Sequence, residues 1–142
     1  MGTVRHILQK KGNMVYSVSP DTCVYDALEN LEDHNVGALV VCEGSHLIGI
    51  FTERDYARKV ILKGRSSKDT HVRDIMSEKP PYVTPDTSID ECMQLMADKY
   101  VRHLPVVEEE KLIGIISIGD VVRFIIGEKD FIIENLEHYI VS

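Results

Sequence analysis

The sequence predicts an α+β (α/β) fold in which two pseudo-symmetric β-α-β-β-α repeats pack sheet to sheet, with an extra helix at each end. Three observations carry this prediction. The chain repeats itself at a fixed offset, its short apolar runs are rich in β-branched residues, and stretches with helical apolar spacing separate those runs. A chain of 142 residues suits one compact unit or two very small ones.

The internal repeat has an offset of 65 residues. The segment 83–87 (Val-Thr-Pro-Asp-Thr) repeats 18–22 (Val-Ser-Pro-Asp-Thr), and about 16 of roughly 44 positions from Val18 onward are identical to their partners. The segments that precede the repeats also match, since 3–8 resembles 71–76. We therefore predict two halves. Residues 1–71 hold a lead-in helix and a repeat core at 14–64, and residues 72–142 hold a core at 79–127 and a C-terminal helix at 130–140.

The elements of the first half follow from residue spacing and turn signals. The chain begins with a predicted helix that is capped by Thr3 and closed by Gly12, followed by a strand at 15–18 and a helix from Val24 that is capped by 20–22. Strands at 38–42 and 47–51 and a helix from Glu53 to about Lys63 come next. A polar loop at 64–70 and a helical turn at 72–76 complete the series. A unit of about 60 residues buries too little surface to be stable alone, so the two copies are expected to stabilise each other.

A hydroxyl residue and an aspartate mark the end of the last strand in each repeat. Thr52 is followed three positions later by Asp55, and Ser117 by Asp120. A helical pattern follows each pair, and free N–H groups at a helix start favour an anion. A carboxylate there suits a vicinal diol, because it accepts two charge-assisted hydrogen bonds. The simpler interpretation is a capping box. The doubled placement favours ligand contact, and the hydroxyl can serve both roles.

These motifs together resemble a known family. The repeat, the two Pro-Asp-Thr turns, the stretch 103–107 (His-Leu-Pro-Val-Val) and the two Gly-Ile-x-(Thr/Ser)-x-x-Asp stretches look like a tandem pair of CBS domains, a Bateman module of the small stand-alone bacterial or archaeal type. The resemblance covers nearly the whole chain. It implies a module that senses adenosine-containing ligands, namely AMP, ADP, ATP or NAD, with S-adenosylmethionine less expected. It also implies homodimers that form flat discs through helix faces.

The resemblance further implies two crossed clefts with named residues. One cleft would hold Ser117, Gly119 and Asp120 with Tyr16, Gly37 and Ala38, and with Arg102 and His103 near the phosphates. The other would hold Thr52, Arg54 and Asp55 with Pro81 and Tyr82. Because Gly37-Ala38 stands where the second repeat has Arg102-His103, the two clefts are expected to differ in how they handle phosphate.

Charge and cysteine content exclude several classes of function. A net charge of −7 disfavours general nucleic-acid binding, and no run reaches transmembrane length. Three cysteines without a Cys-x-x-Cys spacing argue against a disulfide framework or a zinc site and fit a reducing cytoplasm. The stretch 54–73 is locally basic, which suits either a polyphosphate or a solvated helix face and loop.

The leading hypothesis is an adenine-nucleotide-binding regulatory module whose ligand biases the shape of a dimer for an effector protein. The alternative is a structural dimeric scaffold without a physiological ligand. An enzyme is not expected, because we find no nucleophile–base pair, metal set or Gly-rich phosphate loop. A set of apolar residues follows helical spacing after the last strand of each repeat, namely Tyr56, Val60, Ile61, Val121, Phe124 and Ile125. We expect part of this set to form the dimer interface, and the alternative is a role in the core.

Overall fold

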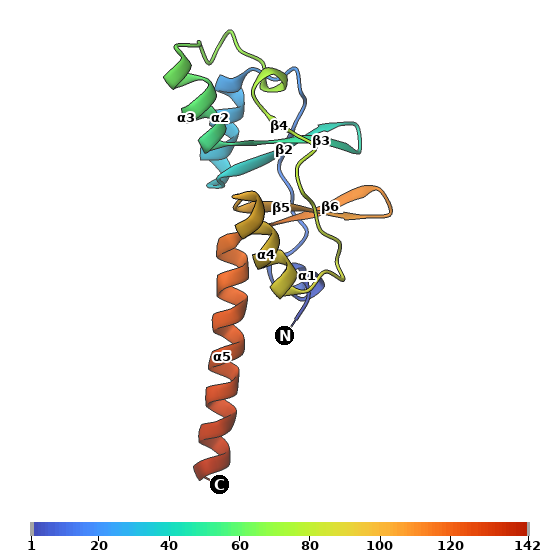
Figure 1. The fold of residues 1–142 in the computed structure, drawn as a ribbon, viewed down its shortest axis with the longest axis vertical. Helices are drawn as coiled ribbons and strands as arrows, with labels where there is room; N and C mark the ends of the chain where they lie inside the picture. The colour runs from blue at the N-terminus through green and yellow to red at the C-terminus, as the bar shows by residue number, and fades with distance from the viewer. Residues whose placement is uncertain (1, 142) are drawn as a thin grey trace.

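The two halves of the molecule repeat one series of elements, as Figure 1 shows. The computed structural model describes the backbone of residues 2–141 and the side chains of residues 2–129. The first half contains β1 (Ser17–Val18), α2 (Val24–His34), β2 (Ala38–Glu43), β3 (His46–Thr52) and α3 (Glu53–Lys59). The second contains α4 (Ile89–Lys99), β5 (His103–Glu108), β6 (Lys111–Ser117) and α5 (Ile118–Val141). The lead-ins are α1 (Val4–Lys11) and, in the second half, η2 (Val72–Asp74) and β4 (Ser77–Glu78). The mixed α+β class is confirmed.

The central hairpins of the two halves share their pairing and the place of a register shift. In the first half β1 pairs parallel to β2, which forms an antiparallel hairpin with β3, and β4 adds to the far edge of β3. In the second half β5 and β6 form the hairpin, and a single parallel bridge from Val83 to Val106 takes the place of β1. The register shifts once in each hairpin, after Val41 and after Val106, two positions 65 residues apart. Strands β3 and β6 contact each other, so the two hairpins meet.

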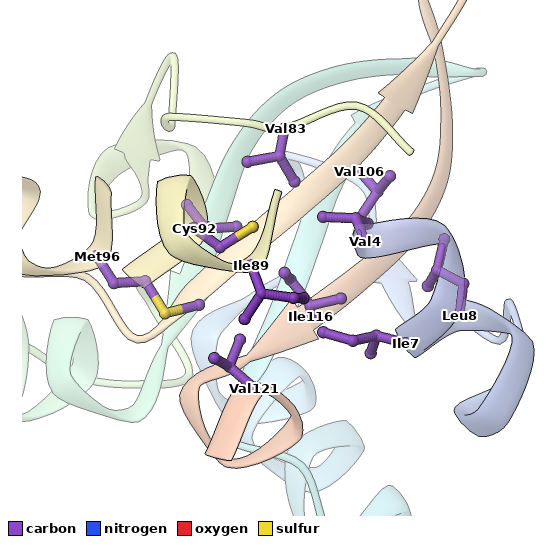
Figure 2. Close-up of a cluster of buried hydrophobic side chains, with 11 residues drawn as sticks. Val4, Ile7, Leu8, Val83, Ile89, Cys92, Met96, Val106, Ile116 and Val121 are labelled. Atoms are coloured by element: carbon purple, nitrogen blue, oxygen red, sulfur yellow. The ribbon is translucent and has the colours of Figure 1, made fainter. Parts of the chain in front are cut away.

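Each lead-in packs against the opposite repeat. Figure 2 shows the core of the second half, where Val4, Ile7 and Leu8 of α1 lie among residues of α4 and the β5–β6 hairpin. In the same way η2 and the residues after it join the core of the first half through Val72 and Ile75. The division of the chain at residue 71 stays a prediction, but packing crosses it. Since each half completes the core of the other, neither small half has to be stable alone.

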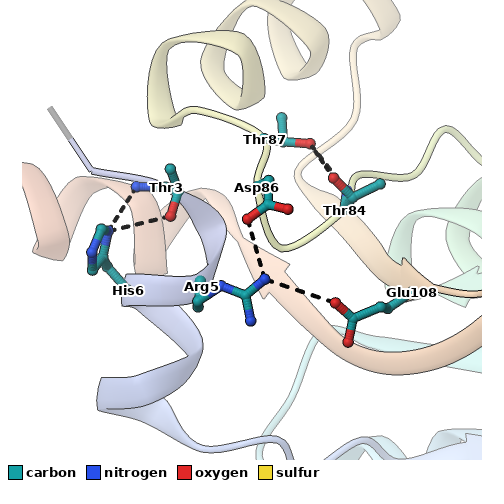
Figure 3. A network of polar contacts seen from close by, with 7 residues as sticks. All are labelled: Thr3, Arg5, His6, Thr84, Asp86, Thr87 and Glu108. Carbon is teal, nitrogen blue, oxygen red and sulfur yellow. Dashed lines mark hydrogen bonds and ion pairs between the residues drawn. The ribbon is translucent and has the colours of Figure 1, made fainter.

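The exchange of lead-ins is symmetric in its polar contacts. Arg5 Nη2 lies 3.1 Å from Asp86 Oδ1 and 3.8 Å from Glu108 Oε2 (Figure 3). Arg73 Nη2 lies 3.0 Å from Asp21 Oδ1 in the other half. The backbone repeats the pattern, with Thr3 bridged to Ser88 and His71 bridged to Cys23. These ion pairs are largely exposed and fix the register of the lead-ins more than they add stability.

Three details differ from the prediction. Helix α3 ends at Lys59, and a separate 3₁₀ turn, η1 (Ile61–Lys63), follows it. Cys23 rather than the 20–22 turn occupies the N-cap of α2, without a side-chain hydrogen bond. The predicted C-terminal helix at 130–140 is present as the continuation of α5, since nothing between 118 and 141 breaks the helix. The side chains from Phe131 to Tyr139, for which the sequence predicts an apolar helix face, lie outside the described ones. None of the described helices has the length and apolarity that a bilayer-spanning segment requires.

Candidate functional site

A cavity of about 830 Å³ lies between the two halves, beside the start of α3. Its walls come from the end of β3 and α3, from the segment 77–81 that leads into the second repeat, and from the connection between α4 and β5. The lining residues are Gly37, Ile50, Thr52, Glu53, Arg54, Asp55, Arg58, Lys59, Ser77, Glu78, Lys79, Pro80, Pro81, Lys99, Tyr100, Val101, Arg102 and His103. The cavity thus brings together seven of the predicted site residues, namely Gly37, Thr52, Arg54, Asp55, Pro81, Arg102 and His103.

Asp55 lies at the wall of this cavity and is only 8% exposed. Its backbone N–H donates to Thr52 Oγ1 (3.1 Å), and its Oδ2 accepts from the backbone N–H and the hydroxyl of Thr52 (3.0 Å each). Its Oδ1 lies 3.1 Å from Lys59 Nζ and 3.5 Å from Ser77 Oγ. The capping box is therefore confirmed. Contact of Asp55 with a ligand stays a prediction, which its place on the cavity wall allows.

The charge of the cavity is opposite to that of the chain. Six lysine and arginine side chains line it, against three carboxylates. Only seven residues long, α3 has a weak dipole, so these side chains and not the helix start supply most of the positive field. Lys59 is neutralised by Asp55, and its Nζ also donates to the Ile75 carbonyl (3.0 Å).

The second repeat contributes the segment that joins α4 to β5. Arg102 and His103 belong to the cavity beside Asp55, although the resemblance grouped them with Asp120. Burial lowers the pKa of His103, and the negative charge of Asp120 opposes this only in part. Gly37 faces the imidazole, since a Cβ there would lie 3.5 Å from His103 Cε1. Arg54 Nη1 reaches the carbonyl oxygen of Tyr100 across the cavity at 3.5 Å.

At the other corner, Asp120 is paired with two cations of the protein itself. Ser117 and Asp120 form the reciprocal cap, with Asp120 N–H to Ser117 Oγ at 3.1 Å and Ser117 N–H to Asp120 Oδ2 at 2.8 Å. Lys11 Nζ lies 2.8 Å from Oδ2 and also donates to the Ile115 carbonyl, while Arg123 Nη2 lies 2.8 Å from Oδ1. Burial alone would raise the pKa of Asp120, but the bonds from Lys11, Ser117 and Arg123 lower it below its ordinary value. The two corners are thus not equivalent.

Four other predicted site residues lie elsewhere. The ring of Tyr16 stacks on His34, with centroids 3.7 Å apart, and Ala38 is buried in the pairing of β2 with β3. Tyr82 is 59% exposed and, of the side chains that the structure describes, is not one that lines the cavity beside Asp55. At Gly119 a Cβ would lie 3.2 Å from Arg123 Nη1. Of the two residues predicted to lie with Asp55 from the second repeat, Pro81 therefore lines the cavity and Tyr82 does not.

Sequence reasoning missed Lys79, Lys99 and Tyr100 as members of the site. A signal for two of them exists, because Lys99 and Tyr100 stand just before Arg102, at the place where the first repeat has His34 and Asn35. Tyr100 and Asn35 both end their helices in the left-handed conformation, with φ of 54° and 52°. Of these two residues, Tyr100 lines the cavity beside Asp55, whereas Asn35 lines a separate hollow with Val36 and Tyr56.

Comparison with known proteins agrees with this architecture. The chain matches the family described as CBS domain over residues 4–62 and 72–127. The Arabidopsis thaliana protein "CBS domain-containing protein CBSX3, mitochondrial" is 45% identical over 148 residues, which cover 97% of this chain and 71% of that protein. A solved CBS-domain protein from Burkholderia ambifaria is 50% identical with a TM-score of 0.86, covering 88% of this chain and 94% of that one.

A third relative was solved with a ligand. The crystal structure of CBSX2 in complex with AMP is 32% identical, with a TM-score of 0.74, and covers 91% of this chain and 99% of that one.

The symmetric halves, their exchanged lead-ins and these similarities lead to one conclusion. The chain belongs to the CBS-domain family and carries two copies of the domain in tandem.

Proposed function

We propose that this protein is a regulatory module that binds an adenosine nucleotide in the cavity beside Asp55. The observation that carries the proposal is a basic cavity, in an otherwise acidic chain, built from both repeats with a buried carboxylate at its wall. The AMP bound by the similar protein CBSX2 supports the choice of an adenosine ligand.

The chemistry of the wall suits the parts of a nucleotide. In this proposal the two hydroxyls of a ribose take the places of Lys59 Nζ and Ser77 Oγ on Oδ1 of Asp55. Arg54 and Arg102 present guanidinium forks that match a phosphate bidentately. Pro80 and Pro81 offer an apolar surface for the base. AMP has roughly 23 non-hydrogen atoms, so about −0.3 kcal/mol per atom bounds the dissociation constant on the order of 10 μM, a value suited to sensing a metabolite.

A second copy of the chain is the partner we propose first. Exposed apolar side chains lie on η1 and α5, namely Ile61, Leu62, Ile118, Val122 and Ile126. Val60 and Val121, expected in the sequence as part of the interface set, are instead fully buried in the two cores. Exposed apolar residues on a helix that leaves the body of the molecule suit a homodimer interface (Figure 1).

Regulation would follow from the position of the ligand between the repeats. A ligand that contacts both halves binds best to one relative arrangement of them, and it shifts the population toward that arrangement. In a dimer this changes the shape that an effector protein meets. We keep a reducing compartment such as the cytoplasm as a prediction, in line with the three free thiols.

A second candidate is a structural dimeric scaffold without a physiological ligand. The observation that favours it is the internal pairing of both corner carboxylates, Asp55 with Lys59 and Asp120 with Lys11 and Arg123. A catalytic activity belongs to neither proposal. Nucleotide incubated with the protein should therefore be recovered unchanged, and product formation above the rate without protein would contradict both.

Calorimetric titration and thermal shift with AMP, ADP, ATP, NAD and S-adenosylmethionine test the proposal. A true ligand raises Tm by mass action. We expect Asp55→Asn to weaken binding about tenfold or more, because a neutral amide is a poorer acceptor for the ribose hydroxyls. Asp69→Asn, at an exposed loop position, is the matched control and should bind like the wild type. Folded protein that binds none of the five ligands would leave the scaffold as the better description.

A further inference from the structure

The cavity beside Asp55 gathers positive charge from three separate parts of the chain. Arg54 and Arg58 come from α3, Lys79 from the segment before the second repeat, Lys99 from the end of α4, and Arg102 from the connection between α4 and β5. We refer to these five side chains as the cavity cations. None of them forms an ion pair with a carboxylate that the structure describes.

This gathering runs against the charge of the whole chain. With Lys59 included, six of the 16 lysines and arginines line one cavity, against only three of the 23 acidic residues. The lining therefore carries three positive charges in excess, while the chain as a whole is at −7. The five cavity cations are exposed, so water moderates the repulsion between these like charges without removing it. A bound polyanion would relieve it.

We propose that this cavity prefers an adenosine ligand with two or three phosphates over one with a single phosphate. The inference rests on the proposed function and narrows it. A single phosphate brings about −2 at neutral pH, and each further phosphate adds roughly one more negative charge. ADP and ATP therefore match the excess in the lining more closely than AMP. NAD carries less negative charge than ADP and S-adenosylmethionine is a cation, so both rank lower.

The positions of the cations suit an extended chain of phosphates. Arg58 stands one helical turn beyond Arg54, so both lie on the same face of α3. Lys99 ends α4 on the wall that the second repeat contributes. A first phosphate near Arg54 and Arg102 leaves Arg58 and Lys99 for the phosphates that follow. These two side chains are therefore the specificity-determining residues of the proposal.

The test compares AMP, ADP and ATP by calorimetry on the intact protein. We expect ADP or ATP to bind at least about tenfold more tightly than AMP at low salt, with the gap narrowing as salt screens the charges. In Arg58→Gln/Lys99→Gln the ratio of ADP or ATP affinity to AMP affinity should shrink to about threefold or less, because affinity for AMP falls less than affinity for the longer nucleotides. Lys63→Gln/Lys111→Gln removes the same charge from exposed positions outside the cavity lining and should keep the wild-type preference.

The outcomes separate this inference from the proposed function. Equal affinity of the wild type for AMP, ADP and ATP overturns the preference and leaves an adenosine-binding module in place. An equal loss of affinity for all three nucleotides in Arg58→Gln/Lys99→Gln also overturns the preference, because these cations would then not contact the second and third phosphates selectively. Absence of binding by any nucleotide overturns both proposals. Tripolyphosphate should compete with ATP only weakly, and competition as strong as that of ATP would show that adenosine is not recognised.

Discussion

Lys11 Nζ lies 2.8 Å from Asp120 Oδ2, so a residue of the first lead-in helix neutralises the corner aspartate of the second repeat. The equivalent aspartate, Asp55, draws its lysine from its own helix, with Lys59 Nζ at 3.1 Å. The two repeats thus neutralise equivalent aspartates with lysines that come from different elements. The difference matters because Lys11 also anchors α1 through the Ile115 carbonyl, which ties the exchanged lead-in to the corner.

Replacing Lys11 should remove an acid-sensitive part of the stability. The pKa of Asp120 is lowered in the folded state, so its ion pair stabilises the fold above the ordinary pKa of an aspartate and is lost as pH falls through the folded pKa. We expect Lys11→Met to reduce the free energy of unfolding at pH 7 by about 1–2 kcal/mol. Urea denaturation across pH should show this difference shrinking as pH falls below the ordinary pKa of an aspartate.

The neighbouring Lys10 provides the control for that experiment. Its Nζ lies 5.6 Å from the centroid of the Phe124 ring and takes part in no described ion pair. Lys10→Met should therefore change stability by an amount that does not depend on acid. A Lys11→Met difference that persists unchanged at low pH would mean that packing of the lysine stem, and not its charge, stabilises the corner.

In each hairpin a glycine leaves room for the side chains or backbone of the lead-in segment from the opposite half. A Cβ at Gly114 would lie 2.9 Å from Leu8 Cδ2, and one at Gly49 would lie 2.6 Å from Met76 Sδ and 3.0 Å from the Ser77 carbonyl. We expect Gly49→Ala to cost about 1–3 kcal/mol, because a backbone atom cannot move aside as a side chain can. Gly37→Ala meets only ordinary contact with His103 and should be close to neutral. Thermal or urea unfolding measures both, and equal losses would refute the steric argument.

The repeat explains why so much of the fold was predictable. Two copies of the same apolar and turn pattern fixed the strands, the hairpins and the capping boxes of Thr52 and Ser117, since these depend on local sequence. The ends of elements were less well predicted, as with α3, because apolar residues three positions apart share a face both in a 3₁₀ turn and in an α-helix. The exchange of lead-ins could not be read from periodicity, which shows that Val4 and Val72 face a core but not which one.

The site was predictable at its corners and not in its grouping. Asp55 and Asp120 look alike in sequence, and only the fold shows that Lys11 pairs with Asp120 while Asp55 borders a cavity. Arg102 and His103 line the cavity beside Asp55 and, through the pairing of His103 with Ser117, also adjoin the corner at Asp120, because their neighbours are set by how the halves pack. Lys99 has a local signal in its place just before Arg102, but Lys79 has none, and the two lie far apart in the sequence.

The thiol of Cys92 should be protected in the folded protein. The side chain is fully buried, and burial raises its pKa to about 11. Since the thiolate is the reactive form, we expect iodoacetamide at pH 8 to label Cys23 before Cys92, with Cys92 labelled only as the protein unfolds. Burial also raises the pKa of Cys42, which should react slowly. Mass spectrometry of peptides after timed labelling measures this. Rapid labelling of Cys92 in folded protein would contradict its burial.

Nucleotide binding should strengthen as pH falls, through His103. Burial lowers the pKa of this imidazole in the free protein, opposed in part by Asp120 and reinforced by Lys11 and Arg102, so it is neutral at pH 7. A phosphate in the cavity favours the protonated ring and raises its pKa, so binding takes up a proton, and affinity should rise by up to about tenfold per pH unit between the free and bound pKa.

The nucleotide itself also titrates near pH 6, so the informative quantity is a difference between proteins. Calorimetry of ADP from pH 8 to pH 6 should give a steeper profile for the wild type than for His103→Gln, which retains a polar side chain of similar size but cannot become charged. His46→Gln, at the exposed tip of the first hairpin, should follow the wild type. Parallel profiles for the wild type and His103→Gln would place the phosphates away from this ring. The ligand would then have to lie toward the α3 wall of the cavity, beside Arg54 and Arg58.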